Sequence, residues 1–299
     1  MAEQSKVVTQ TDPLFEEPAR EALRVRPEGG SVPELADVDT DAAPGFDGDK
    51  AAGEEALSER AEVLSELQEL LYANSTRDDA SEVPSVLLVV QAMDTAGKGG
   101  IMRHVVGAMD PQGVDITAFK KLTREEAAHD FLWRVRPYLP KPGRVAVFDR
   151  SHYEDVLVHR VRELSPLAEV QRRYKAIREF EHGVAAAGTR IVKVMLHISA
   201  DEQKERLAER LERPEKHWKF NPGDIDEREH WDGYMEAYRI AMEETDTDQA
   251  PWFVVPADKK WYARLAVQEL LIETLQELRL GWPPADFDVE EQKKRLAAT

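Results

Sequence analysis

Short runs of apolar residues alternate along most of the chain with segments whose apolar residues recur every three or four positions. The short runs predict buried strands, and the recurring positions predict amphipathic helices. The expected strands are 85–91, 114–119, 144–149, 190–199 and 252–256, and the expected helices are 56–72, 97–109, 123–136, 166–187, 200–213, 227–243 and 260–278. Such alternation predicts an α/β three-layer sandwich, a parallel sheet with helices on both faces.

The pattern over residues 56–72 places its apolar residues on one stripe, which consists of Leu57, Ala61, Leu64, Leu67 and Leu71. A stripe of this kind packs either on the protein's own core or on a second subunit, and we favour the core. The stretch before it is acidic, because residues 1–50 contain 12 acidic and 5 basic side chains, a net charge of -7. We expect residues 1–20 to be a disordered acidic tail and the charged segment 290–299 to fray.

The segment QAMDTAGKGG, residues 91–100, joins the first buried strand to a helix. In a phosphate-binding loop at this position, backbone N–H groups point at phosphate oxygens, the helix N-terminus adds positive potential and a lysine reaches the terminal phosphates. The residues that supply these features are Ala96, Gly97, Lys98, Gly99 and Gly100. The common pattern GxxxxGK[ST] is broken, since Ala92 replaces the first glycine and Gly99 the metal-binding Ser or Thr. A glycine-rich turn with a solvated lysine is the alternative interpretation.

Two carboxylates are placed to substitute for the missing metal ligand. Asp94 lies within the loop, and Asp149 ends the apolar strand RVAVFD. The carboxyl ends of parallel strands gather along one edge of a sheet, so both side chains are expected beside the phosphates. Hard oxygen ligands suit Mg²⁺, and Mn²⁺ is a second candidate. Capping of the following helix is an alternative role for Asp149, and the two roles are compatible.

Residues 204–219 form a net positive segment in an acidic chain, with six Lys or Arg and four Glu. Arg206, Arg210 and Arg213 recur at helical spacing, and Pro214 ends the helix. A solvated helix with Glu–Arg pairs would show the same pattern. The segment follows the strand 190–199 and therefore starts at the same sheet edge as the loop. In nucleoside-kinase-like P-loop folds, a helix at this position carries arginines that close over the transferring phosphoryl group.

Composition narrows the possible partners. The net charge of -18 and the pI near 5.0 argue against non-specific binding to nucleic acid or to a membrane. The chain has no cysteine, which excludes disulfides and thiolate chemistry and fits a cytoplasmic protein. The N-terminus shows no apolar signal region, and no apolar run is long enough for a transmembrane helix.

Five segments together resemble the polyphosphate kinase 2 family, whose members transfer phosphoryl groups between inorganic polyphosphate and nucleotides. They lie between residues 22 and 278 and read QAMDTAGKGG, AFKKLTREEAAHDFLWRV, VFDRSHYEDVLVHRV, LHISADEQKERLAERLERPEKHWKF and TDTDQAPWFVVPADKKW. The resemblance implies a P-loop kinase-like fold in which Asp94 and Asp149 hold magnesium. The YEDVL form resembles the subgroup that acts on both nucleoside mono- and diphosphates, whereas GKGG departs from the GKDG often seen there.

The resemblance also implies residue roles and partners. The expected catalytic residues are Asp94, Lys98, Asp149, Arg150, Arg206 and Arg210. The polyphosphate chain is expected to follow Arg103, Lys120, Lys216 and Lys219. Glu154 lies one helical turn past Asp149, where it either supports a second metal or pairs with Arg150. Expected partners are inorganic polyphosphate, AMP, ADP, ATP or their guanine equivalents, and further copies of the same chain in a homo-oligomer.

Three parts of the chain follow from these expectations: the tail 1–20, an N-terminal arm and helix over 21–82, and a P-loop kinase domain over 83–299 with a lid at about 204–226. Two other functions remain open. An ATP-dependent nucleotide or nucleoside kinase of similar fold is disfavoured by Gly99, because such enzymes normally keep Ser or Thr there. A non-catalytic protein that binds polyphosphate or nucleotide is disfavoured by the joint presence of Asp94, Lys98 and Asp149.

Overall fold

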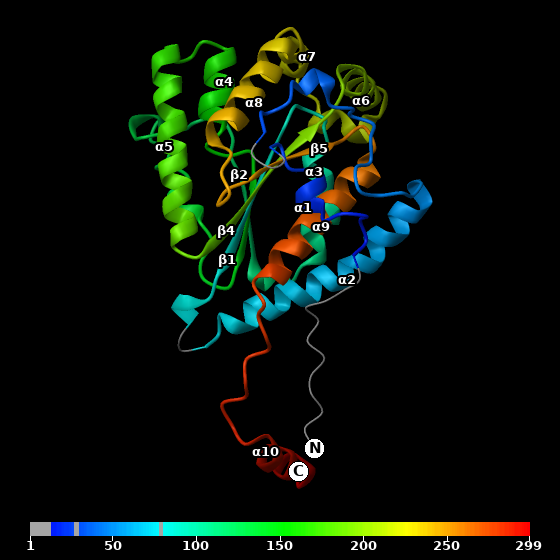
Figure 1. The fold of residues 1–299 in the computed structure, drawn as a ribbon, viewed down its shortest axis with the longest axis vertical. Coiled ribbons are helices and arrows are strands. Elements are labelled where there is room, and N and C mark those ends of the chain that lie inside the picture. Colours follow the sequence, from blue (N-terminus) through cyan, green and yellow to red (C-terminus); the bar gives the residue numbers. More distant parts are fainter. Residues whose placement is uncertain (1–12, 27–29, 78–79) are drawn as a thin grey trace.

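The computed structural model describes residues 13–26, 30–77 and 80–299 (Figure 1). Its centre is one parallel sheet of five strands in the order β2-β3-β1-β4-β5. The strands are β1 Ser85–Ala92, β2 Val114–Ala118, β3 Val145–Asp149, β4 Thr189–His197 and β5 Trp252–Pro256. Every residue of β1 and β5 is buried, as expected for apolar strands covered on both faces.

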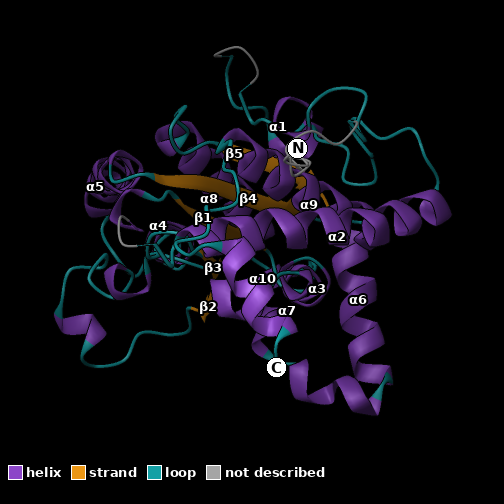
Figure 2. Cartoon of the chain, turned by 90° about the horizontal axis from the view of Figure 1, so that it is seen from below, coloured by secondary structure: helices purple, strands orange, loops and turns teal. Residues whose placement is uncertain are grey.

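Helices cover both faces of this sheet (Figures 1 and 2). One layer contains α2 Lys50–Asn74, α3 Lys98–His104 and α9 Lys260–Glu277, with the short α1 Ala19–Ala22 against α9. The other layer contains α4 Glu154–Val161, α5 Leu167–Ala186 and α8 Trp231–Thr245. The three-layer α/β architecture predicted from the sequence is therefore confirmed.

The remaining helices lie outside these layers. Those at the carboxyl end of β4 are α6 Ala200–Glu212, a 3₁₀ turn Pro214–Lys219 and α7 Gly223–Arg228. The last helix, α10 Val289–Ala297, lies apart from the body in Figure 1, and none of its residues is buried. Asp288 caps this helix by accepting a hydrogen bond from the backbone N–H of Glu291, and the fraying expected for residues 290–299 stays a prediction.

The register of the central strands brings the loop and the strand-end aspartate together. In the β1–β3 pair Val90 lies opposite Asp149, and the backbone N–H of Arg150 donates to the carbonyl of Val90 at 3.0 Å. The segment 93–97 leaves β1 just beyond this point. Residues from two distant parts of the sequence thus meet at one edge of the sheet, as the sequence predicted.

Three predicted helices differ from the structure. Residues 123–136 form isolated 3₁₀ turns, including Glu126–Ala128, because most of this segment is exposed and a helix needs a packed face for stability. The predicted helix 227–243 is divided between α7 and α8 at residues 229–230. The α-helix predicted over 97–109 ends at His104 and continues as the 3₁₀ turn Val106–Ala108.

The N-terminal region is more ordered than the sequence suggested. Of the tail predicted to be disordered, residues 1–12 lie outside the described residues, whereas 13–20 pack on the core. Phe15 is 4% exposed and stacks on Tyr262 with ring centroids 6.3 Å apart. The N–H groups of Ala19 and Arg20 both donate to the carboxylate of Glu273.

Helix α2 begins earlier than predicted, with the Asp49 side chain as its N-cap. Leu64, Leu67 and Leu71 of the predicted stripe are buried, and α2 packs along α9. The stripe therefore covers the protein's own core.

Candidate active site

The segment 93–97 and the first turn of α3 form an open cradle. Gly97 has φ 122, a conformation that L side chains rarely adopt. A Cβ atom added at Gly97 or Gly99 would have no neighbour within 4 Å, so the space in front of both backbones is free. Lys98 is the first residue of α3, and its Nζ atom donates to the carbonyl of Ala92 at 3.0 Å. Free backbone at a helix N-terminus beside a lysine is the arrangement of a phosphate site.

The back of the cradle is held by helix α6. Thr95, a β-branched residue, has φ 66, which is unfavourable outside glycine. Gln203 donates to the carbonyl of Asp94 at 3.1 Å, and Arg206 donates to the carbonyls of Thr95 and Ala96 at 3.1 and 3.2 Å. Three successive loop carbonyls are thus fixed by one helix.

The predicted role of Arg206 requires its side chain to face the transferring phosphoryl group, but the side chain instead contacts the backbone of the loop. It is 5% exposed, and its Nη2 atom donates to the carbonyls of Ala257 and Asp258 at 2.7 and 2.8 Å. Its Nε atom donates to the carboxylate of Glu202 at 2.7 Å. Every nitrogen of the guanidinium is engaged with the protein, so Arg206 supports the loop from behind instead of facing the free space in front of it.

Charged groups converge beside the cradle. Arg150 Nη2 lies 3.0 Å from Asp94 Oδ1, and Arg150 has φ 63. Burial and the charge of Arg150 lower the pKa of Lys98, while Asp94, Asp149 and Glu154 act in the opposite direction. Burial raises the pKa of Glu154, and the charges of Arg150 and Lys98 oppose this shift. The other four predicted side chains therefore all lie within electrostatic reach of Lys98.

A cavity of about 580 Å³ opens on the α4 and α8 side of this cluster. Its polar end includes Asp94, Arg150 and Glu154, and its apolar wall includes Phe119, Leu122, Leu157 and Val158. Lys120, predicted for the polyphosphate path, lies in this cavity. The volume and the mixture of an apolar wall with a few charged groups fit a nucleotide-sized ligand.

A second charged region lies on the α3 and α9 side of the loop. The guanidinium of Arg264 packs against Gly100, where an added Cβ would meet its Nε atom at 3.3 Å. Burial and the charges of Arg103 and Arg206 lower the pKa of Arg264, although Glu54 opposes them. Burial, followed by the charge of Arg206, lowers the pKa of Lys260, Glu209 and Glu202 oppose this change, and Lys216 adds a smaller lowering effect. We call Arg103, Lys216, Lys260 and Arg264 the cationic surface. Repulsion within two pairs, Arg103 with Arg264 and Lys216 with Lys260, favours a bound anion.

The predicted lid residues are partly brought to the site. Arg210 Nη1 lies 3.5 Å from Asp224, a cavity residue, and 3.3 Å from the carbonyl of Lys219. Lys219 is exposed, with its Nζ atom 4.9 Å from the ring centroid of Trp218. Lys216 acts on Lys260 in the cationic surface, whereas Lys120 lines the cavity.

The carboxylates also fit a hard metal ion. Asp94 and Asp149 both act on the same ammonium group of Lys98. Among the residues that the structure describes, no group of three or more His, Cys, Asp or Glu is gathered as a metal site. Two carboxylates alone fit Mg²⁺, which keeps several waters and takes its other ligands from substrate phosphates.

A phosphate cradle, a strand-end aspartate, a nucleotide-sized cavity and a helical lid on a parallel sheet define a P-loop phosphotransferase. The family model for polyphosphate kinase 2 matches residues 48–280. The chain therefore belongs to the polyphosphate kinase 2 family, and the enzyme class predicted from the sequence is confirmed.

Individual relatives agree with this assignment. The chain is 47% identical to the AMP/ADP-polyphosphate phosphotransferase of Meiothermus ruber over 90% of its length and 97% of that protein. It is 44% identical to the ADP-polyphosphate phosphotransferase of Rhodopseudomonas palustris over 77% of this chain and 81% of that one. The crystal structure of polyphosphate kinase 2 from Arthrobacter aurescens superposes with a TM-score of 0.91 at 53% identity, covering 95% of this chain and 98% of the other.

Several site features were missed from the sequence. Lys260 and Arg264 follow the loop by more than 150 residues. Lys260 is part of the KKW that ends one resembling segment, and Arg264 lies three residues beyond that segment. Tyr234 and Tyr238 carried no motif, and Gln203 lay within a resembling segment but was not singled out. Over the described part of the chain, no helix has the length and apolar character needed to cross a membrane. Cytoplasmic location and homo-oligomer formation stay predictions.

Proposed function

We propose that this enzyme transfers phosphoryl groups between inorganic polyphosphate and nucleotides and accepts both nucleoside mono- and diphosphates. One observation carries the proposal: the loop adjoins both a nucleotide-sized cavity, at Ala92, Met93 and Asp94, and the cationic surface, where Arg264 packs on Gly100. A mononucleotide fits the cavity with its phosphates toward Arg150. A long polyanion needs an open row of cations instead, and the cationic surface offers one beside the same loop.

In the proposed reaction, an oxygen of the acceptor nucleotide's terminal phosphate attacks the terminal phosphorus of polyphosphate. The bond to the shortened polyphosphate breaks, and no side-chain nucleophile is required. Lys98 and the N–H groups of 97–100 bind the transferring group, and Arg150 and Arg210 neutralise its oxygens. Asp94 and Asp149 would hold a divalent cation, Mg²⁺ or Mn²⁺. When bound, this ion neutralises charge on the donor and acceptor phosphates.

The direct test is to incubate the purified protein with ADP, polyphosphate and Mg²⁺ in the absence of ATP. We expect ATP to form. If ATP forms only from a nucleoside triphosphate donor, the protein is an ATP-dependent kinase. If the protein binds ADP without any turnover, it is a binding protein.

Use of AMP is proposed to depend on Glu154. A monophosphate lacks one phosphate anchor, and the half-buried carboxylate of Glu154, which lines the cavity, is placed to support a second cation or its water shell. We expect ADP to form from AMP and polyphosphate with the wild type. We expect Glu154→Asn to lose AMP turnover about tenfold more than ADP turnover. Equal losses with both acceptors would remove Glu154 from this explanation, and no AMP turnover by the wild type would leave a diphosphate-only kinase.

The polyphosphate path is proposed to follow the cationic surface into the lid. The double variant Lys216→Ala/Lys219→Ala is expected to raise the KM for polyphosphate several-fold, with less change in the KM for ADP. The expected KM also rises steeply with salt, as for other dense polyanions. Lys175→Ala/Lys293→Ala is the matched control, because both lysines are exposed and each pairs with a glutamate on its own helix. Identical polyphosphate KM values for the two double variants across a salt series would refute the path.

A further inference from the structure

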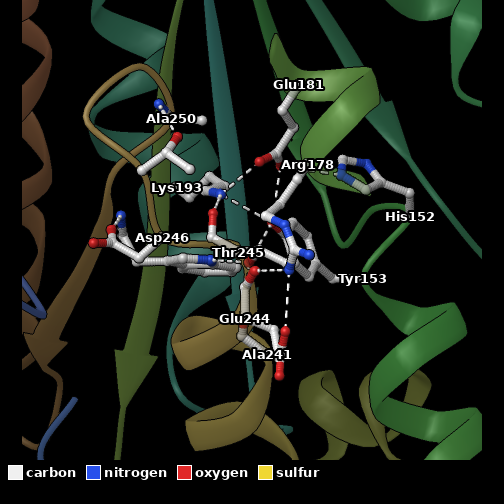
Figure 3. A network of polar contacts seen from close by, with 12 residues as sticks. His152, Tyr153, Arg178, Glu181, Lys193, Ala241, Glu244, Thr245, Asp246 and Ala250 are labelled. Carbon is white, nitrogen blue, oxygen red and sulfur yellow. Dashed lines mark hydrogen bonds and ion pairs between the residues drawn. The ribbon is translucent and has the colours of Figure 1, made fainter. Parts of the chain in front are cut away.

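A charged lysine lies in the middle of β4, between buried aliphatic neighbours. Lys193 is fully buried, a position that is strongly unfavourable for an ammonium group without partners. Its Nζ atom donates to Glu181 Oε2 at 2.6 Å, to the hydroxyl of Tyr153 at 2.9 Å and to the carbonyl of Thr245 at 2.9 Å. Figure 3 shows these groups converging from β4, α5, the β3–α4 turn and α8.

The carboxylate of Glu181 is the second centre of this network. Its Oε1 atom accepts from the hydroxyl of Tyr153 at 2.9 Å and contacts Nε2 of His152 at 3.3 Å. Burial lowers the pKa of Lys193, while the charge of Glu181 opposes this change. Burial acts to raise the pKa of Glu181, but the charge of Lys193 together with the charge of His152 and the hydrogen bonds from both side chains lowers it. The pair is therefore an ion pair, and Glu181 binds two consecutive side chains of the turn that precedes α4.

This turn carries active-site residues at both of its ends. Tyr153 directly precedes Glu154 and lies three residues after Arg150. The backbone of Arg150 has positive φ, which is kept only where the surroundings fix it. Ser151 and His152, between them, are buried, and the Tyr153 N–H donates to Ser151 Oγ at 3.2 Å. A tyrosine hydroxyl bound in the core therefore fixes where Arg150 and Glu154 emerge into the cavity.

The same network also holds the opposite wall of the cavity. Lys193 binds the carbonyl of Thr245 at the C-terminal end of α8, and Arg178 binds the carbonyl of Glu244. Cations at helix C-termini are favourable because the last carbonyls there lack partners within the helix. Further along α8, Tyr234 and Tyr238 line the cavity. One cluster thus joins the turn before α4 to α8, and the acceptor cavity lies between them.

Stability alone does not account for this cluster. Well-packed aliphatic side chains in place of a buried ion pair are often neutral or stabilising, whereas charged groups with several partners specify one arrangement. We propose that Lys193, Glu181 and Tyr153 are positioning residues that fix Arg150 and Glu154 relative to α8 in the acceptor cavity. This assignment rests on the proposed function only for the identity of the acceptor.

The test compares two Tyr→Phe variants that each remove one buried hydroxyl. Tyr153→Phe removes the centre of the network. Tyr262→Phe, the matched control, removes the hydrogen bond from a fully buried tyrosine to the carbonyl of Pro44, far from the turn in sequence and on α9. For each variant we would measure Tm, kcat and KM with ADP and polyphosphate, and the Kd of ADP by calorimetry. All assays would be run well below both Tm values.

We expect Tyr153→Phe to lower kcat/KM for ADP about tenfold and to raise the ADP Kd about fivefold. Tyr262→Phe is expected to change both less than twofold, although its Tm also falls. A purely structural role predicts equal behaviour of the two variants, and that outcome would overturn the proposal. If the wild type is inactive with polyphosphate, the proposed function fails, but the ADP Kd values still decide the positioning role.

A second variant covers the case in which Tyr153→Phe fails to fold. Lys193→Met/Glu181→Gln removes both charges together, so that neither is left buried alone. Retained Tm with a tenfold loss in kcat/KM for ADP supports positioning. Retained Tm with wild-type kcat/KM and ADP Kd refutes it.

Discussion

Substitution of Arg206 by lysine tests whether this side chain supports the loop or contacts the transferring phosphoryl group. The guanidinium donates to one carboxylate and four backbone carbonyls, at distances from 2.7 to 3.2 Å. Lysine has three donors on a single atom and cannot reach both carbonyl pairs. We therefore expect Arg206→Lys to lose two or three of these hydrogen bonds.

The expected cost follows from the burial of the abandoned partners. Each buried carbonyl left without a partner costs about 1–3 kcal/mol, so the total is about 3–5 kcal/mol after the bonds that lysine recovers. For a chain of 299 residues, a change of that size lowers Tm by about 5–8 °C. Release of the Thr95 and Ala96 carbonyls also lets the cradle relax. We expect kcat/KM to fall about tenfold to a hundredfold, because small displacements of positioned groups are costly.

The assay combines differential scanning calorimetry with steady-state kinetics on ADP and polyphosphate. Arg213→Lys is the matched control: it lies on the same segment, but its partners Glu209 and Glu215 are exposed, and such surface pairs contribute little. A wild-type Tm for Arg206→Lys with reduced kcat would refute the supporting role and restore the predicted contact with the phosphoryl group. Wild-type values of both quantities would refute both roles.

Other predictions concern the proposed phosphate and metal ligands and one buried carboxylic acid, Asp155. Lys98→Ala and Asp149→Asn are each expected to abolish phosphoryl transfer while the circular dichroism spectrum stays unchanged. Excess chelator is expected to abolish transfer by the wild type. Full activity of either variant, or of the wild type with chelator, would contradict the proposed phosphate and metal site. Asp155 is 4% exposed, and burial raises its pKa to about 6, with Arg173 opposing the shift. The folded state therefore binds the proton more tightly than the unfolded state, and stability falls as pH rises from about 4 to 6. The free energy of unfolding of Asp155→Asn, measured with urea, should rise relative to that of the wild type by about 1–3 kcal/mol as the pH increases from 4 to 7. A difference that stays constant over this pH range would contradict the raised pKa.

The strands and the loop were predictable because local sequence determines them. A strand such as β1 reads as an apolar run since both its faces are covered. The positions of Lys98 and Asp149 follow from the rule that parallel strands end along one edge. In contrast, residues 123–136 have helix-forming composition, but Ala127 and Ala128 face solvent, and the Arg134 side chain binds the carbonyl of Lys120 instead. Helix α4 was missed because it is short and rich in β-branched valine.

Side-chain direction was the part of the site that sequence spacing did not determine. Arg206 and Arg210 are one helical turn apart, and both were expected to face the phosphates. The first turns of α6 lie behind the loop, so Arg206 meets backbone carbonyls, whereas Arg210 reaches Asp224 further along the lid. The ion pair of Lys193 and Glu181 had one sequence signal, a lysine inside an apolar strand run. Its partner Glu181 lies twelve residues earlier, and only the packing of α5 on β4 brings the two side chains together.

The cavity and the cationic surface adjoin the same loop but are built from different residues, and this arrangement has a kinetic consequence. The cavity is lined from α4, α7 and α8, and the cationic surface consists of residues of α3, α9 and the 3₁₀ turn Pro214–Lys219. A nucleotide leaving through the cavity mouth does not have to displace a polyanion held on the cationic surface. Successive acceptors can then be phosphorylated from one polymer without its release. Initial-rate plots for the two substrates would intersect, as for a ternary complex, and the chains of a partly consumed polyphosphate pool would shorten unevenly, some nearly consumed while others stay intact.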